Sequence, residues 1–588
     1  MKKVMTIMML CASVTLLPSC SSDDDDNWLD DWYGEQETGG AVSTGGSVSA
    51  SSGELTTFTV SIDKTSAEPA ATVSEVFPDE EDNLASNSFS TEVAITFDGT
   101  NATYTTAEGV SVTVNGAHVV ADHGATKGVC YTVSGSTTNG SLTIVGSKKY
   151  EVKLCGVNVT NPDSAALNLL SSKRAYIVLQ DGTANTLADG TTSKADHKGA
   201  LYFKGKLLFN GSGSLEVYGN YNNGIHSADY ILFRQGNNVY VNSTANHGIK
   251  ANDGIYINGG IVNVEVSALA AKGINCESNI VVNGGRTTVI TTGTGTYDSD
   301  DGGVKGSAAI KADSTYTQNG GEVYLKSTGA GGKGLKTDYE AYVNGGRLCV
   351  ITEGTRFTSS GDTASPKGIK IGTKNVHGVL QLTDGTVLVR TKGIGGEGIE
   401  SKGTLAISGG TVQVSAYDDA VNSASDMTIS GGTVVAVGTG NDGLDANGNM
   451  YVKGGNIVAY GASGAESGID TDEQHRLYIT GGSIFGIGGR IDASLGSTTQ
   501  GIATASGSVS AGTAVTLADG STTIASFTMP PYSYSNGTIM LSAPGMTSGS
   551  SYTLSLGGST QSITASSTLS SGMGGGGMQP GGGRHGGW

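Results

Sequence analysis

The stretch Gly248–Val266 reads GIKANDGIYINGGIVNVEV, and Gly273–Ile290 repeats its pattern as GINCESNIVVNGGRTTVI. Each copy opens with Gly-Ile and reaches a Gly-Gly pair about ten residues later, and in the first copy apolar residues then alternate with others. Apolar side chains at every second position, as at Val262, Val264 and Val266, are typical of a β-strand that buries one face. The pattern therefore predicts short strands separated by glycine turns.

The same unit recurs along most of the chain, and weaker copies extend it back to about residue 130. A unit of about 24 residues holds three short strands and cannot bury its inward side chains alone, but stacked units can. We therefore expect an all-β protein, a right-handed parallel β-helix across residues 130–500, with coils about 4.8 Å apart. An aliphatic residue marks each clear copy: Ile225, Ile249, Ile274, Ile310, Leu335, Ile369, Ile399, Val421, Leu444 and Ile469.

Composition agrees with a repeat protein. Glycine accounts for 93 of the 588 residues, about 16%, against an average near 7%. Only 9 prolines and no Gly-X-Y period are present, which excludes collagen. Hydrophobic residues make up 37% and charged residues 15%, too apolar a mixture for a wholly disordered chain. The net charge of −19 disfavours a nucleic-acid partner.

The first twenty residues are typical of a bacterial lipoprotein signal. Lys2 and Lys3 precede an apolar stretch over 4–17 that is too short to span a bilayer, and the segment ends in Cys20. We expect cleavage after residue 19, lipidation of Cys20 and attachment to the membrane only through that anchor. An ordinary signal peptide with an incidental cysteine is the alternative.

The residues after Cys20 indicate where such a protein goes. The acidic run Asp23–Asp26 resembles the export signal of some Gram-negative outer-surface lipoproteins, although a plain solvated charge run is possible. Residues 20–53 are acidic and then rich in Gly, Ser and Thr, which predicts a flexible tether. We therefore expect a lipid-anchored outer-membrane protein, monomeric and facing the cell exterior.

Three segments flank or interrupt the repeats. Residues 54–129 are expected to form an N-terminal β cap, residues 501–570 a small C-terminal β module, and residues 571–588 a disordered glycine-rich tail. Two coils carry the insertions Gly293–Gly306 and Gly354–Pro366, which predict loops over one face. The remaining cysteines have no CxxC pair and indicate no disulfide scaffold: Cys130, Cys155, Cys276 and Cys349.

The residue after each aliphatic marker should point outward, and this column is basic early and acidic late. It reads His226, Lys250, Asn275, Lys311, Lys336, Lys370, Glu400, Asn422, Asp445 and Asp470. We predict that Lys250, Lys311, Lys336 and Lys370 bind carboxylates of an acidic sugar polymer. Surface ion pairs with Asp313 and Asp338 are an equally good interpretation.

The late coils are expected to hold calcium. Like charges about 4.8 Å apart repel by roughly 0.9 kcal/mol in water and about 3.5 kcal/mol at an effective dielectric of 20. A calcium ion removes that cost and accepts carboxylate, amide and carbonyl oxygens. A solvated acidic edge is the alternative. The predicted ligands are Asp419, Asn422, Asp442, Asp445, Asn447, Asp470 and Asp472.

Tyrosines recur three residues before the Gly-Gly pairs, at Tyr256, Tyr342, Tyr451 and Tyr478. Their phase is opposite to that of the inward residues, so they should stand on an outer sheet face. A row of tyrosines can stack on sugar rings, which predicts carbohydrate-binding residues. Ordinary cross-strand aromatic packing explains them nearly as well.

The ordered succession of motifs resembles a known family, the bacterial carbohydrate-binding domain-containing proteins. It is carried by YEVKLCGVNVTN (Tyr150–Asn161), AYIVLQDGTANTLADG (Ala175–Gly190), LEVYGNYNNGI (Leu215–Ile225), the Gly-Ile coils and the Gly/Met/Pro tail Met573–Trp588. This resemblance implies a calcium-binding β-helix that is similar to polysaccharide lyases and binds cellulose or pectic polymers.

Three functions remain open from the sequence. The favoured one is a non-catalytic cell-surface lipoprotein that binds plant-type polysaccharide on a calcium-stabilised face. The second is a calcium-dependent polysaccharide lyase, in which Lys311, Lys336 or Lys370 removes the C5 proton of a uronate. The third is an adhesin or structural surface protein. The sequence contains no GxSxG, HExxH or Walker motif.

Overall fold

The computed structural model describes residues 53–194 and 197–569, which fall within one compact unit. The expected signal peptide, Cys20, nearly all of the tether and the glycine-rich tail lie outside these residues. The described part of the chain contains no helix long and apolar enough to cross a membrane. Its only helices are α1 (Gly53–Thr57) and the 3-10 turns η1 (Glu80–Asp82) and η2 (Leu84–Ser86).

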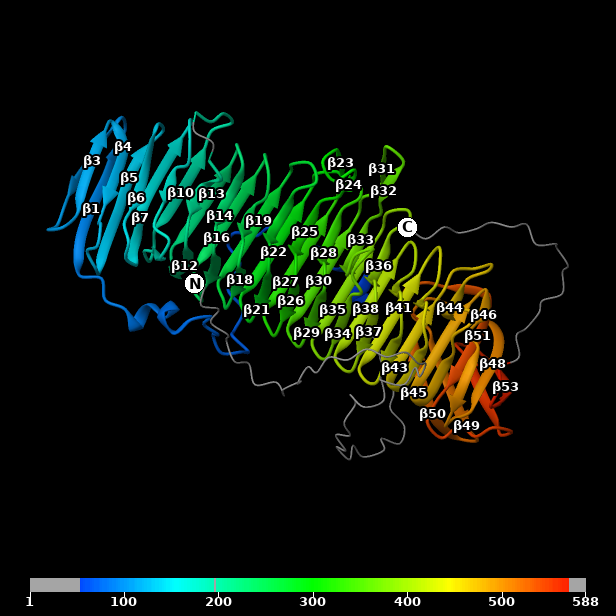
Figure 1. The fold of residues 1–588 in the computed structure, drawn as a ribbon. Coiled ribbons are helices and arrows are strands. Elements are labelled where there is room, and N and C mark those ends of the chain that lie inside the picture. The colour runs from blue at the N-terminus through cyan, green and yellow to red at the C-terminus, as the bar shows by residue number, and fades with distance from the viewer. Residues whose placement is uncertain (1–52, 195–196, 570–588) are drawn as a thin grey trace, which may run out of the picture. The chain divides into compact units, whose positions relative to one another are not determined.

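Parallel strands stack coil upon coil from β1 (Thr91–Asp98) towards the C-terminal strands, and the colours in Figure 1 follow this order. We call the 16-stranded sheet face 1. Its strands are β3(Ser111–Asn115), β4(Ala117–Asp122), β6(Gly140–Val145), β8(Leu167–Leu169), β11(Gly199–Phe203), β14(Asn223–Ser227), β17(Ile249–Ala251), β20(Lys272–Cys276), β25(Ala308–Ala312), β28(Lys333–Thr337), β33(Lys367–Ile371), β36(Glu397–Ser401), β39(Val421–Ser423), β42(Leu444–Ala446), β44(Ser467–Thr471) and β46(Arg490–Asp492).

The 29-stranded sheet contains two further ladders, which we call face 2 and face 3. Face 2 has β9(Arg174–Leu179), β12(Lys206–Gly211), β15(Tyr230–Phe233), β18(Gly254–Ile257), β21(Asn279–Val282), β26(Thr315–Gln318), β29(Glu340–Val343), β34(Val379–Leu382), β37(Thr404–Ile407), β40(Met427–Ile429) and β47(Leu495–Thr498). Face 3 has β10(Ala184–Asp189), β13(Ser214–Gly219), β16(Asn238–Ser243), β19(Ile261–Val266), β22(Arg286–Thr291), β27(Glu322–Ser327), β30(Arg347–Thr352), β35(Thr386–Thr391), β38(Thr411–Ala416) and β41(Thr433–Gly438). Long strands join the two ladders: β5(Val129–Thr137), β7(Tyr150–Asn161), β43(Met450–Tyr460) and β45(Leu477–Gly488).

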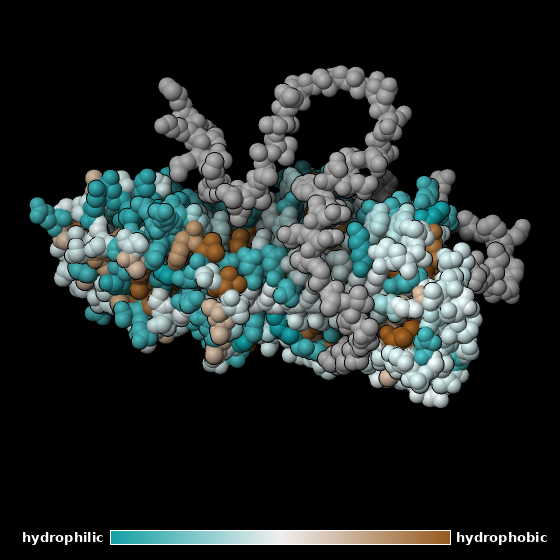
Figure 2. All heavy atoms as spheres, turned by 90° about the horizontal axis from the view of Figure 1, so that it is seen from below, coloured by the Kyte–Doolittle hydropathy of each residue, from teal (hydrophilic) through white to brown (hydrophobic). Residues whose placement is uncertain are grey.

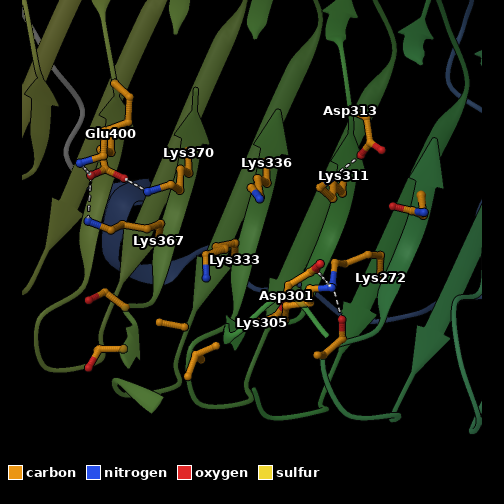
Figure 3. Close-up of a pocket in the computed structure, with 18 of the residues that line it drawn as sticks. Lys272, Asp301, Lys305, Lys311, Asp313, Lys333, Lys336, Lys367, Lys370 and Glu400 are labelled. Carbon is orange, nitrogen blue, oxygen red and sulfur yellow. Dashed lines mark hydrogen bonds and ion pairs between the residues drawn. The ribbon is translucent and has the colours of Figure 1, made fainter. Parts of the chain in front are cut away.

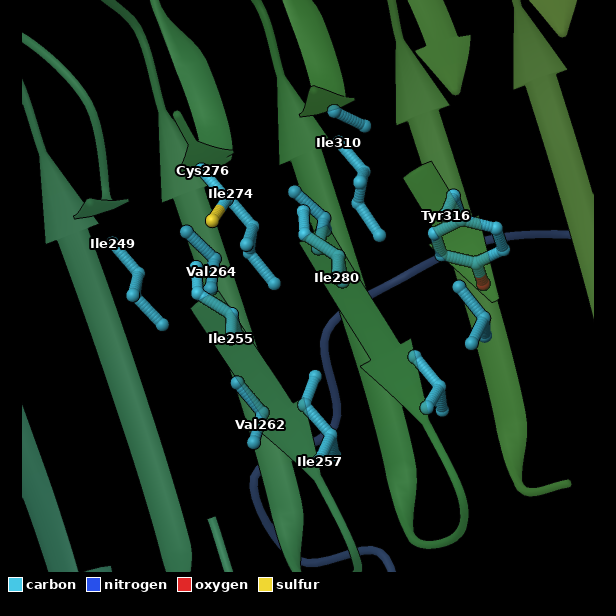
Figure 4. Packing of buried hydrophobic residues seen from close by; sticks show 14 of the residues in the cluster. Ile249, Ile255, Ile257, Val262, Val264, Ile274, Cys276, Ile280, Ile310 and Tyr316 are labelled. Carbon is cyan, nitrogen blue, oxygen red and sulfur yellow. The ribbon is translucent and has the colours of Figure 1, made fainter. Parts of the chain in front are cut away.

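The ten aliphatic markers pair with one another in register on face 1, from Ile225 with Ile249 through to Leu444 with Ile469. All of them are buried. Figure 4 shows Ile249, Ile274 and Ile310 side by side in the core. The expected all-β solenoid of parallel strands is confirmed, while its right-handedness and its coil length of about 24 residues remain predictions.

Apolar side chains from all three faces fill this core, and each fully buried one contributes about 1.5–3 kcal/mol. The turns between faces 2 and 3 need glycine, because the second residue of the Gly-Gly pair takes a left-handed conformation, with φ 79° at Gly260 and 70° at Gly285. On the face seen in Figure 2, apolar residues appear only as separate patches among hydrophilic ones.

The segment expected as an N-terminal cap, residues 54–129, divides into two parts. Strand β1 (Thr91–Asp98) pairs in parallel with β5 and already belongs to the stacked coils. The antiparallel strands β2 (Asn101–Thr105) and β3 cover the exposed edges of β1 and β4. The antiparallel pairs at this end of the coils thus lie within residues 91–122.

Residues 53–90, which we call the strap, instead follow the outside of the coils backwards. Near α1, Phe58 packs with Ile351 and Leu388 of face 3, and Figure 1 shows blue α1 beside β35 and β38. At the other end, Asp82 accepts a hydrogen bond of 2.7 Å from Arg174 on face 2. The strap thus contacts faces 2 and 3.

The two insertions form antiparallel hairpins, β23(Thr296–Asp298) with β24(Gly303–Lys305) and β31(Phe357–Ser359) with β32(Asp362–Ala364). The hairpins touch, because Val304 N–H donates to Asp362 Oδ2 at 2.6 Å. Each hairpin leads into a strand of face 1, the first into β25 and the second into β33.

The C-terminal strands of the described chain pair antiparallel. Strands β48(Ile502–Val509) and β51(Tyr534–Ser542) pair antiparallel at the end of the coils. A four-stranded sheet follows, in the order β50(Thr522–Thr528), β49(Ala514–Asp519), β52(Ser551–Leu556) and β53(Ser559–Thr564). All four described cysteines are free thiols, and Cys130 lies opposite Glu151 rather than Cys155.

Candidate functional site

A groove of about 690 Å³ lies on face 1, between strand β20 and strand β36, with the two hairpins along one side. Its lining is strongly basic, as Figure 3 shows. Eight lysines line it: Lys272, Lys305, Lys311, Lys333, Lys336, Lys367, Lys370 and Lys402. Only four carboxylates do so: Glu277, Asp301, Asp313 and Glu400.

The outward column of the sequence lies on face 1 in the expected order. Register pairs join His226 to Lys250, Lys311 to Lys336, Lys336 to Lys370, and so on to Asp470. Lys250 lies one coil before the groove and forms an ion pair of 2.8 Å with Glu277.

The three column lysines inside the groove have carboxylate partners. Lys311 pairs with Asp313 and, at 3.1 Å, with Asp338, which also lies 3.3 Å from Lys336. Burial opposes the charge of Lys311, but the hydrogen bond to Asp313 raises its pKa overall. Lys370 lies 2.8 Å from Glu400, yet burial lowers the pKa of Lys370.

A second row of lysines was missed by the sequence reasoning. Lys272, Lys333 and Lys367 begin their strands, and register aligns them through Ala308. Each lies two residues before an aliphatic marker, where simple alternation predicts a side chain in the core, yet all three line the groove. The recurring Lys-Gly-aliphatic triplet was the available signal.

Only one of these three lysines is neutralised. Lys367 forms ion pairs with Glu397 and, at 3.3 Å, with Glu400; although burial opposes it, these carboxylates raise the pKa of Lys367. Burial, together with Lys336 and Lys311, lowers the pKa of Lys272 to about 7. Burial and the neighbouring Lys370 hold the pKa of Lys333 well below its usual range.

The acidic end of the outward column, from Asn422 to Asp470, lies on the coils of face 1 directly after Glu400. Asn422 donates to Asp445 Oδ2 at 2.7 Å, and Asp445 lies opposite Asp470 on the next coil. Burial raises the pKa values of these carboxyl groups, to about 7 for Asp419, 8 for Asp442, 9 for Asp445 and 6 for Asp470.

Burial is the largest cause of each of these shifts, and neighbouring carboxylates add to it, such as Asp419 beside Asp445 and Asp492 beside Asp470. Within the described residues, no group of three or more His, Cys, Asp or Glu side chains is drawn together as a metal site. Asn447 and Asp472, the other two predicted ligands, lie two residues after Asp445 and Asp470.

The four predicted tyrosines share one column of face 2, away from the groove. Tyr451 and Tyr478 stack with their centroids 5.0 Å apart and their planes at 11°. Two rings that lay edge to edge in one plane would clash at this centroid distance. The two rings are therefore stacked face to face, as in ordinary cross-strand packing. Tyr256 packs on an apolar cluster that strap residue Phe77 also contacts, and Tyr342 donates to Glu340.

Comparison with known proteins gives a consistent family match. A family model described as "Carbohydrate-binding domain-containing protein" matches residues 115–270, 240–382 and 385–580, which is most of the chain. A protein of the same description from Acetivibrio thermocellus is 30% identical over 151 residues, covering 24% of this chain and 51% of the relative. The chain therefore spans about half the length of that relative.

A solved structure is also similar to part of the chain. It is that of the polysaccharide lyase-like protein from C. thermocellum, as a gadolinium derivative. The sequences are 20% identical, the match covers 50% of this chain and 96% of the other, and the TM-score is 0.33.

Proposed function

The chain belongs to the carbohydrate-binding domain-containing protein family, and from this membership we propose that it binds an acidic polysaccharide in the groove of face 1. The observation that carries the proposal is the excess of eight lysines over four carboxylates in a single groove. Carboxylates of a polyuronate are the natural counter-ions for such a lining. The protein as a whole is acidic, so the attraction is local.

The shape of the groove supports a linear polymer. Lysines recur on successive coils, which are about 4.8 Å apart, close to the length of one sugar unit. The strap covers parts of faces 2 and 3 and contacts residues there rather than on face 1. A chain lying along the coils therefore meets one or two ammonium groups per coil.

Neutral glucan is the less favoured ligand. It was suggested by the tyrosine column, but the parallel pair Tyr451 and Tyr478 stack on each other instead of presenting one flat platform. Pectic polymers, in contrast, carry the charge that the lysines complement. We therefore expect uronate-rich polymers to bind more tightly than cellulose, with affinity falling as salt rises.

The acidic end of the column supports a calcium site as part of this proposal. Carboxyl groups with raised pKa values, such as Asp442 and Asp445, repel each other when ionised, and a divalent cation would relieve that repulsion. Asp419, Asp470 and the amide of Asn422 would supply further oxygen ligands of the kind calcium prefers. Calcium is expected to stabilise these coils and the end of the groove.

The site of action is proposed from the N-terminal sequence alone. Lipidation at Cys20 and the acidic run Asp23–Asp26 would hold the protein at the outer cell surface, where it would retain glycan near the membrane. Metabolic labelling with a palmitate analogue, compared between the natural chain and Cys20→Ala, tests this. Equal labelling of both would exclude the anchor.

One observation favours a second function, a polysaccharide lyase. A lyase needs a neutral base at the C5 proton of a uronate. Lys272 lines the groove and has a pKa of about 7, which suits a base better than Lys311 with its raised pKa. Ultraviolet absorbance of unsaturated products, formed from polygalacturonate and alginate with calcium, would establish that activity.

Affinity electrophoresis tests the binding proposal. Native protein is run in gels containing polygalacturonate, pectin or hydroxyethyl cellulose, with calcium or with chelator. Retardation by the uronate polymers that weakens in salt is expected. Migration unaffected by every polymer would refute binding and leave the adhesin or structural role.

A further inference from the structure

Two lysines on the floor of the groove lie beside the same residue, Gly306. Lys272 begins β20 and Lys333 begins β28, two coils apart, with Ala308 between them in register. Lys272 Nζ donates to the carbonyl of Gly306 at 3.0 Å and also to that of Ala270. Lys333 Nζ lies 2.8 Å from the position that a Cβ atom on Gly306 would occupy. Both ammonium groups therefore flank Gly306.

Lys272 and Lys333 differ from the other lysines of the groove because neither forms an ion pair with a carboxylate of the described residues. The hydrogen bonds of Lys272 go to carbonyl oxygens, and Lys333 Nζ donates to Gly331 O at 2.7 Å. Among the described residues, no Asp or Glu oxygen lies within ion-pair distance of either nitrogen. By contrast, Lys367 on the next coil is held by Glu397.

Resting on the function proposed above, we propose that Lys272 and Lys333 form an oxyanion subsite, which receives one carboxylate or sulfate ester of the bound glycan. Two N–H donors beside one residue, with no carboxylate on either, can each bond one oxygen of a single anionic group. A neutral hydroxyl would leave their mutual repulsion uncompensated. The subsite selects for acidic sugars at this position of the groove.

Burial and the charges around the pair favour binding of an anion. Lys333 is only 9% exposed, and Lys272 is partly buried. The titratable groups that face the pair come from every surrounding element. They are His247, which precedes β17, Asp301 and Lys305 near the first hairpin, Lys311 of β25, Asp313 directly after β25, Lys336 of β28, and Lys367 and Lys370 of β33.

Their sum is positive, so an incoming oxyanion supplies the missing counter-charge. Binding must then draw protons onto the pair, because Lys272, with a pKa near 7, is largely neutral at pH 8. Proton uptake is the signature that separates this subsite from general attraction by the groove.

The test is isothermal titration of the full chain with oligogalacturonate, a sulfated oligosaccharide and inorganic sulfate, at pH 6 and 8. Titrations at pH 8 are repeated in buffers of different ionisation enthalpy, which yields the number of protons taken up. The variants are Lys272→Met and Lys333→Met. Lys326→Met on face 3, which removes an ion pair with Glu353 outside the groove, is the matched control.

We expect each groove variant to bind the acidic oligosaccharides about tenfold to hundredfold more weakly, the loss of one charge-assisted hydrogen bond. The natural chain should take up protons at pH 8, Lys272→Met should take up fewer, and the control should behave as the natural chain. Weak binding of sulfate alone would show that the sugar is needed.

The outcomes separate the two proposals. If the natural chain binds the oligosaccharides but Lys272→Met and Lys333→Met bind equally well, the subsite is wrong and the groove remains the binding site. If proton uptake at pH 8 is the same in the natural chain and in Lys272→Met, the subsite is also wrong. If no acidic oligosaccharide binds the natural chain, both proposals fail.

Discussion

Replacing Lys272 by methionine should stabilise the protein, and the gain should grow as pH falls. Methionine keeps the length of the side chain but removes the ammonium group from a floor where Lys336 and Lys311 add to the effect of burial. The pKa of Lys272 is lowered from 10.5 to about 7 in the folded protein. The folded state therefore binds this proton less well than the unfolded chain does.

The difference between the unfolded and folded pKa of Lys272 sets the sign and the size of the change in stability. Above pH 10.5 the lysine is neutral in both states and costs nothing. As pH falls from 10.5 to 7, the unfolded chain takes up the proton first, and the cost rises to about 5 kcal/mol, after which it stays constant. Methionine loses hydrogen bonds to two carbonyls, about 1 kcal/mol each. The variant should gain about 3 kcal/mol at pH 6 and lose about 2 kcal/mol near pH 11.

Urea unfolding followed by circular dichroism at pH 6, 8 and 10 measures this difference. Lys326→Met, which only loses a partly exposed ion pair, should change stability by less than about 1 kcal/mol at each pH. A stability difference for Lys272→Met that does not vary with pH would refute the reasoning. Confirmation would mean that the groove keeps a charge at the expense of stability, as functional sites often do.

Three further outcomes are expected. We expect calcium to raise the melting temperature at pH 9, and Asp445→Asn should abolish most of that rise. The rise should be smaller at pH 6, because raised pKa values keep carboxyl groups such as Asp445 protonated there. An equal calcium effect at both pH values in scanning calorimetry would contradict this. Arg174→Met leaves the fully buried Asp82 without its cation and should cost about 3–5 kcal/mol and speed proteolysis of the strap, whereas unchanged cleavage would show that the strap is held otherwise. Gly306→Ala places a Cβ atom 2.1 Å from Gly331 O, so we expect about 1–3 kcal/mol of destabilisation and weaker oligogalacturonate binding, both absent if the turn relaxes freely.

The periodic features of the structure could be predicted because stacking carries them from coil to coil. In-register parallel pairing places like positions side by side, so the aliphatic markers and the column from His226 to Asp470 follow from spacing alone. The two insertions were also predictable as loops. Their contact through Val304 and Asp362 was not, since each insertion interrupts a different coil.

Features that depend on contacts between distant parts of the chain could not be predicted from the sequence. Nothing periodic marks residues 53–90, and the pair Asp82 and Arg174 joins positions 92 residues apart. Periodicity therefore carries no signal for the strap. Sequence spacing likewise does not determine the orientation of the tyrosine rings, and in the structure Tyr451 and Tyr478 face each other.

The sequence by itself determined the repeating strands, the glycine turns and the succession of basic and acidic coils, because each depends on neighbours along the chain and on a constant stacking register. Only the tertiary structure decided which charges are compensated. Lys311 finds Asp338 while Lys272 and Lys333 find carbonyls, and that difference depends on burial and on side chains brought together from several coils and a hairpin. Electrostatic energy depends on such distances in space, which spacing in sequence does not contain.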